Sequence, residues 1–157
     1  MSLIRRGRLA VTRDELIDKI ATSIAFVEGF YKKGKYPTVA QRLANPGNIR
    51  QWRKHGRAYP RSHGYVDFVA WARRSLPDGT PASEVAAAAE AEGWRVLRVL
   101  IGQYIDGRYH AGVSPTLLEM FRVFAPAEDG NRPESYAKVV ARRAGIPLDR
   151  PLRELID

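Results

Sequence analysis

The first half of the chain opens with a helical hydrophobic pattern. Apolar residues from Asp14 to about Phe30 recur every three or four positions and are flanked by polar ones. Thr12 or Asp14 can cap the start, and Gly29 or Gly34 marks the end. The pattern predicts a helix over 14–30, with its apolar face formed by Leu16, Ile17, Ile20, Ala21, Ile24, Ala25 and Val27.

The stretch 35–68 has no helical period and is interrupted by prolines and glycines. We expect a loop-rich segment with a short hairpin near 65–68. Irregular segments of this length inside a compact domain tend to be functional.

The second half is predicted to be helical, with helices over 84–105, from Ser114 to about Phe124, and from about Asn131 to Gly145. No internal repeat is evident. The pattern therefore predicts a mainly α fold, with the loop-rich or short β segment at its side.

Length and composition fit one globular domain over 1–157, with 1–13 as a flexible N-terminal segment. No apolar run approaches the ~20 residues that cross a bilayer, and the N-terminus lacks the apolar stretch of a secretory signal. The chain has no cysteine, and its three histidines are scattered, so we expect neither a metal nor a cofactor. A net charge of +9 indicates an anionic partner such as a cell-wall polymer, a membrane surface or nucleic acid.

Glu28 is the first candidate for chemistry. It continues the apolar line of Ile17, Ala21 and Ile24 at the C-terminal end of the predicted helix. Burial and the negative end of the helix dipole both raise the pKa of a carboxyl group, which would suit a general acid. The alternative is a structural carboxylate that pairs with an arginine or lies at the edge of the core.

The second candidate is the turn "LANPGNIR" at 43–50. Its two amides, Asn45 and Asn48, can bond back to the chain, as amides in turns commonly do. Alternatively, they and Arg50 line a substrate groove and bind the acetamido and hydroxyl groups of a sugar. The sequence leaves both roles open.

Together these segments resemble a known family. The order "AFVEGFY", "NPGNIR", "EGWRVLRVLI" and "TLLEMFRVFAPAEDGNRPESYAKVV" is similar to the lysozyme-like, lytic-transglycosylase-type domains of phage and bacterial cell-wall enzymes. The resemblance covers roughly 15–147. It departs from the family pattern at Ala44, where the family has a further asparagine, and in a longer stretch after Phe68.

The resemblance implies a single lysozyme-like domain whose segment 45–68 forms one wall of a substrate groove. It implies that Glu28 is the catalytic acid and base, and that the helix bearing Tyr136 faces it. The substrate would be the peptidoglycan glycan strand, cleaved between N-acetylmuramic acid and N-acetylglucosamine by lytic transglycosylation. Such an enzyme would act at the cell wall or periplasm, and we expect a monomer that binds no nucleic acid.

No acidic residue lies between Glu28 and Asp67, which favours a mechanism with one carboxylate. Asp67 is the candidate second carboxylate, with an ordinary exposed strand residue as the alternative. Each of the three tryptophans could stack on a sugar ring, with core packing as the alternative. Trp52, in a polar loop, is the candidate for an exposed ring, whereas Trp71 and Trp94 are expected in the core.

Two other functions stay open at this point. A basic helical nucleic-acid-binding domain would use the cations of 50–61. A virion or structural module could keep the lysozyme-like fold without catalysis.

Overall fold

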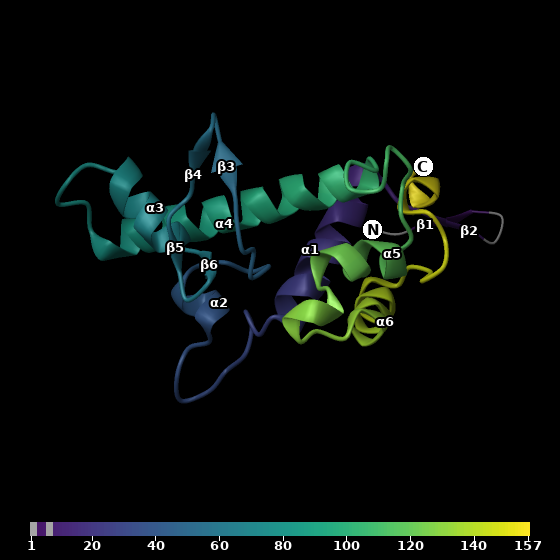
Figure 1. The fold of residues 1–157 in the computed structure, drawn as a ribbon, viewed down its shortest axis with the longest axis horizontal. Coiled ribbons are helices and arrows are strands. Elements are labelled where there is room, and N and C mark those ends of the chain that lie inside the picture. The colour runs from purple at the N-terminus through teal and green to yellow at the C-terminus, as the bar shows by residue number, and fades with distance from the viewer. Residues whose placement is uncertain (1–2, 6–7) are drawn as a thin grey trace. The chain divides into compact units, whose positions relative to one another are not determined.

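The computed structural model describes residues 3–5 and 8–157. The fold is mainly α, as predicted, with short antiparallel hairpins between helices (Figure 1). In chain order the elements are β1 (Leu3–Arg5), β2 (Arg8–Ala10), α1 (Arg13–Val27), α2 (Val39–Arg42), β3 (Arg53–Lys54), β4 (Arg57–Ala58), β5 (Arg61–Ser62), β6 (Tyr65–Val66), α3 (Phe68–Ser75), α4 (Ala82–Ile105), α5 (Leu117–Phe124), η1 (Ala127–Asp129), α6 (Pro133–Ala144) and η2 (Leu152–Leu155).

The chain divides into two compact units. One contains the described residues of 1–23 together with 98–157, and the other contains 24–97. The chain passes from one unit to the other within α1 and within α4. Whether 1–157 forms a single lysozyme-like domain stays a prediction, and each unit is described by itself below.

The first unit is built on α5 and α6. A capping box formed by Thr116 and Glu119 starts α5. The ring of Tyr136 on α6 stacks on Phe121 of α5, with centroids 4.5 Å apart. Their buried neighbours are apolar, so the two helices share a core that contains Leu117, Met120, Ala137 and Val140.

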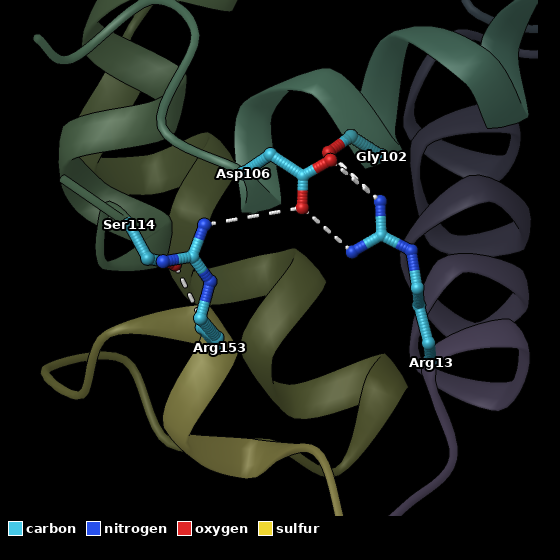
Figure 2. A network of polar contacts seen from close by, with 5 residues as sticks. All are labelled: Arg13, Gly102, Asp106, Ser114 and Arg153. Atoms are coloured by element: carbon cyan, nitrogen blue, oxygen red, sulfur yellow. Dashed lines mark hydrogen bonds and ion pairs between the residues drawn. The ribbon is translucent and has the colours of Figure 1, made fainter. Parts of the chain in front are cut away.

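An ion-pair network joins three parts of this unit (Figure 2). Arg13, at the start of α1, donates from both terminal nitrogens to the two carboxylate oxygens of Asp106, at 2.8 and 2.9 Å. Arg153, on η2, lies 4.0 Å from the same carboxylate, and its backbone N–H donates to Oγ of Ser114 at 2.9 Å. All three charged side chains are about half exposed, so the network orients segments more than it stabilises them.

The N-terminal segment was expected to be flexible over 1–13. Residues 1–2 and 6–7 lie outside the described part of the chain. In the described part of this segment, β1 pairs with β2 in an antiparallel register that places Leu3 opposite Ala10. Val11 then forms a parallel bridge with Ile156 near the other end of the chain.

The second unit holds the loop-rich segment and most of the candidate residues. The observed elements there differ from those expected. The single hairpin expected near 65–68 is instead a pair of hairpins, β3–β4 and β5–β6. The expected strand ends at Val66, since Asp67 accepts a hydrogen bond from the backbone N–H of Ala70 and so caps α3.

No helix in the described residues is both long and apolar enough to cross a membrane.

Candidate functional site

Glu28 directly follows Val27, the last residue of α1, and begins a tight turn. The backbone N–H of Phe30 donates to the carbonyl of Ala25, and that of Gly29 donates to the carbonyl of Phe26. This is the Schellman pattern, which needs a left-handed residue after the helix, and Gly29 supplies it at φ +78°. The half-buried side chain of Glu28 is therefore fixed at the C-terminal end of α1.

Thr38, which caps α2, and Gln41 of α2 both bond to this turn. Thr38 donates from its hydroxyl to the carbonyl of Gly29 at 3.1 Å, and the Gln41 amide donates to the carbonyls of Phe30 and Lys32. A Cβ on Gly29 would lie 3.2 Å from the methyl group of Thr38. The "EGF" signature thus has a local physical cause, because the turn needs both a positive φ and a small residue.

The Asn-Pro-Gly-Asn turn is organised by Asn45. This side chain is fully buried; its amide nitrogen donates to the carbonyls of Ile49 and Val66, and its oxygen accepts from the N–H of Ile49. Of the two roles left open by the sequence, the geometry favours the structural one for Asn45, which ties the turn to β6.

Asn48, at the other end of the turn, reaches the candidate acid. Its amide nitrogen donates to Oε1 of Glu28 at 3.4 Å. Its backbone has the positive φ of +46° that asparagine tolerates better than most residues. Its own side-chain oxygen is buried and has no hydrogen-bond partner among the described residues. Such an acceptor favours a ligand that brings a donor.

The turn rests on α4 through close contacts of glycine. A Cβ on Gly93 would lie 2.1 Å from the carbonyl oxygen of Ala44, and one on Gly47 would lie 2.7 Å from a methyl carbon of Leu97. The backbone of the turn therefore lies directly against α4, and this contact fixes the position of Asn48 relative to that helix.

The other predicted residues of this unit lie further along the same segment. Arg50 is exposed, and its guanidinium group lies over the ring of Tyr65 at 5.6 Å. Trp52 is half-buried, and its carbonyl accepts from the N–H of Tyr59. Asp67 is half-buried and caps α3, so its carboxylate already has a structural task.

Tyr136 does not lie in the same unit as the other predicted site residues. It belongs to the first unit, where its ring is buried against Phe121 and Phe124. The site described here is therefore assembled from the second unit alone. That Tyr136 faces Glu28 stays a prediction.

A buried polar cluster escaped the sequence reasoning. Glu92 on α4 is 7% exposed; it accepts from the hydroxyl of Tyr59 at 2.5 Å and from two nitrogens of Arg95 at 2.5 and 2.9 Å. Burial, and then the bond to Glu92, raise the pKa of Tyr59 to about 12. Burial acts to raise the pKa of Glu92, but the bonds from Arg95 and Tyr59 outweigh it and lower that pKa. Only the spacing of Glu92 and Arg95 on one helix face could have indicated part of this cluster.

Aromatic residues also gather beside the Glu28 turn. Phe30 and Tyr31 contact Trp94, with ring centroids 5.6 and 6.4 Å away, and Trp94 is half-buried rather than in the core as expected. Trp71 is also half-buried and stacks on Tyr59 at 5.8 Å.

Among the described residues, no group of three or more metal-ligating side chains could hold a metal ion. Comparisons with family models, with curated proteins and with solved structures found no match to this chain.

Proposed function

We propose that this protein cleaves the glycan strands of peptidoglycan between N-acetylmuramic acid and N-acetylglucosamine, with Glu28 as the only catalytic carboxylate. The observation that carries the proposal is the contact between Asn48 and Glu28. Two short motifs, 20 residues apart in sequence, meet at one carboxylate, and both belong to the resemblance to lytic-transglycosylase-type domains.

The surroundings of Glu28 support its role. The carboxylate is half-buried on a turn that is held by Thr38 and Gln41, so its position is fixed before a substrate arrives. Asn48 offers an amide to orient it. The aromatic rings of Phe30, Tyr31 and Trp94 next to the turn are of the kind that pack against the apolar faces of sugar rings.

Two of the other carboxylates of the second unit, Asp67 and Glu92, already have structural partners. Asp67 caps α3, and Glu92 is buried between Tyr59 and Arg95. Hydrolysis with two carboxylates needs a second acid at a suitable distance to activate water or attack the sugar. This supports a reaction in which the substrate supplies its own nucleophile.

The proposed reaction has two steps. Glu28 first donates its proton to the glycosidic oxygen as the bond from that oxygen to C1 of the muramoyl residue breaks. The C6 hydroxyl of the same residue then bonds to C1 and gives its proton to the Glu28 carboxylate. The products are a glycan with a free N-acetylglucosamine hydroxyl and a 1,6-anhydromuramoyl end, and the enzyme recovers its proton.

Digestion of purified sacculi tests the proposal. We expect muropeptides whose masses are lower than those of hydrolysis products by one water. Products with the mass of hydrolysed muropeptides would contradict the transglycosylase step. They would still support cleavage of the glycosidic bond. An absence of any cleavage would favour a lysozyme-like module without catalysis.

A further inference from the structure

The two hairpins of the second unit share the same turn and the same arginine hydrogen bond. In β3–β4 Arg53 pairs with Ala58 across the turn His55-Gly56, and in β5–β6 Arg61 pairs with Val66 across the turn His63-Gly64. The first arginine of each hairpin donates to the carbonyl of the turn glycine at 3.0 Å. The motif Arg-x-His-Gly thus recurs after eight residues, which corrects the expectation that the chain has no internal repeat.

Both turns place histidine where glycine or asparagine is usual. His55 has φ +51° and His63 has φ +54°, and each is followed by a glycine that also has positive φ. Histidine in this region costs backbone free energy. The same residue at both tips, beside an arginine held in the same way, gives the two hairpins matching exposed side chains.

The excess positive charge of the chain lies in the segment that contains these hairpins. The segment 29–66 contains nine lysines and arginines and no acidic residue. The net charge of the whole chain is +9, so the remaining 17 lysines and arginines are balanced by 17 acidic residues. The basic character that the composition revealed is therefore a property of one segment of the second unit.

The hairpins offer this charge with little aromatic surface beside it. Their cations Arg53, Lys54, Arg57 and Arg61 are exposed, as are both histidines. Tyr59, between the hairpins, is 6% exposed and stacks on Trp71, and the half-buried ring of Tyr65 is covered by Arg50. Proteins that bind single-stranded nucleic acid gain about 1–3 kcal/mol for each base stacked on an aromatic ring. Among residues 53–66 no tyrosine ring is fully exposed, and the two exposed histidine rings belong to separate hairpins.

We propose that the twin hairpins, residues 53–66, form a binding site for a flexible phosphodiester polymer that carries no bases, such as a polyol-phosphate chain. Arginine binds phosphate with two nitrogens, and the repeated Arg-x-His-Gly unit suits an anion that recurs along a chain. Binding at this site does not depend on cleavage by Glu28. It would attach the protein to an anionic polymer.

The experiment measures binding of three probes of equal phosphate number: a poly(glycerol phosphate), an abasic deoxyribose-phosphate oligomer and oligothymidylate. We expect the abasic oligomer to bind at least as tightly as oligothymidylate, and the polyol phosphate to bind as well. The double variant Lys54→Gln/Arg57→Gln keeps both arginines that bond to the turns. We expect it to lower the slope of log affinity against log salt by about 1.4, since each contact with a single strand contributes about 0.7.

The matched control is Lys138→Gln/Arg142→Gln, which removes the same charge from exposed positions of α6. It should leave affinity and slope close to those of the wild type. Equal losses of affinity in both double variants would overturn the proposal, because the effect would then follow net charge alone. Oligothymidylate binding more than about tenfold tighter than the abasic oligomer would overturn it in favour of nucleic acid, through base stacking. Absence of binding to all three probes would also overturn it, and none of these outcomes depends on cleavage by Glu28.

Discussion

The amide nitrogen of Asn48 lies 3.4 Å from Oε1 of Glu28, and each residue is placed by its own local structure. The Schellman turn at Gly29 fixes Glu28, whereas the buried side chain of Asn45 fixes the turn that ends in Asn48. The contact therefore joins two segments that are each rigid, which is the arrangement that holds a catalytic group in a productive orientation.

The variant Glu28→Gln tests the assignment of the catalytic acid. It keeps the shape of the side chain and its contact with Asn48 but cannot transfer a proton. We expect cleavage of sacculi to fall by at least ~100-fold, the usual scale for loss of a positioned acid or base. Stability should hold or rise, because an amide is cheaper to bury than a carboxylate. The measurements are muropeptide release and thermal unfolding.

The control for this variant is Asp78→Asn, which neutralises an exposed carboxylate in the loop before α4. It should cleave like the wild type. Equal activity of Glu28→Gln and wild type would make the assignment wrong, and Asp67 would be the next carboxylate to replace. Severe unfolding of Glu28→Gln would instead indicate a structural carboxylate.

Two substitutions at Asn48 separate binding from backbone strain. Asn48→Gly removes the amide but accepts the φ of +46°, whereas Asn48→Ala removes the amide and is strained there. We expect both to weaken binding of muropeptides, but only the alanine variant to lose stability, by about 1–2 kcal/mol. Calorimetric binding and urea unfolding of the two variants provide the comparison. Unaltered binding in Asn48→Gly would limit Asn48 to a role in the turn.

The sequence could predict the parts of this site that depend on local motifs. The end of α1 follows from a glycine after an apolar helical line, and the turn at 45–48 follows from Asn-Pro-Gly-Asn. The roles of its two asparagines could not be separated, because they depend on Val66 and Glu28, which lie 21 and 20 residues away.

The two hairpins and the cluster of Tyr59, Glu92 and Arg95 could not be predicted from the sequence, for different reasons. Two-residue strands carry no measurable alternation, and His-Gly is not the turn that signals a hairpin as Asn-Gly does. The contact between Tyr59 and Glu92 joins residues 33 apart in sequence, and a polar residue on a helix gives no sign that it will be buried.

Asn45→Ala should be among the most damaging changes in the second unit. It leaves the N–H of Ile49 and the carbonyl of Val66 without their partners inside the protein, and buried unpaired groups cost about 1–3 kcal/mol each. We expect a loss of about 2–4 kcal/mol in the free energy of unfolding. Asn131→Ala is the control, since its half-buried amide makes a longer bond of 3.4 Å to the carbonyl of Pro126. A loss no larger than that of the control would contradict the role given to Asn45.

Gly93→Ala should destabilise the protein although it lies inside a helix. Alanine normally favours an exposed helix by about 1 kcal/mol over glycine. Here the added carbon would lie 2.1 Å from the carbonyl oxygen of Ala44, so the turn bearing Asn48 must move. We expect a loss of several kcal/mol and weaker substrate binding. Gly102→Ala, in the same helix, meets the flexible end of Arg13 at 3.0 Å and a methyl carbon of Ile17 at an ordinary 3.7 Å, so it should cost much less. Equal effects would mean that the turn does not lie against α4 at Gly93.

The Tyr59 and Glu92 pair predicts how stability changes at high pH. The pKa of Tyr59 is about 12 in the folded protein, against about 10 for an unfolded tyrosine, so between these values the unfolded chain has lost a proton that the folded chain keeps. Stability is then fully present below about pH 10 and falls as the pH rises toward 12. Burial raises the pKa of Tyr104 as well, so some loss is expected from that residue too.

The variant Tyr59→Phe isolates the contribution of Tyr59 to this loss of stability, because Tyr104 is present in both the variant and the wild type. At neutral pH the variant should be less stable by about 1.5–3 kcal/mol, the value of a hydrogen bond to a charged group. From pH 9 to 11 its stability should fall less steeply than that of the wild type, and urea unfolding at a series of pH values measures both. At low pH both proteins should weaken as the pH falls through the lowered pKa of Glu92, because Arg95 still bonds to that carboxylate. Parallel curves between pH 9 and 11 would show that the hydroxyl of Tyr59 is not held by Glu92 in solution.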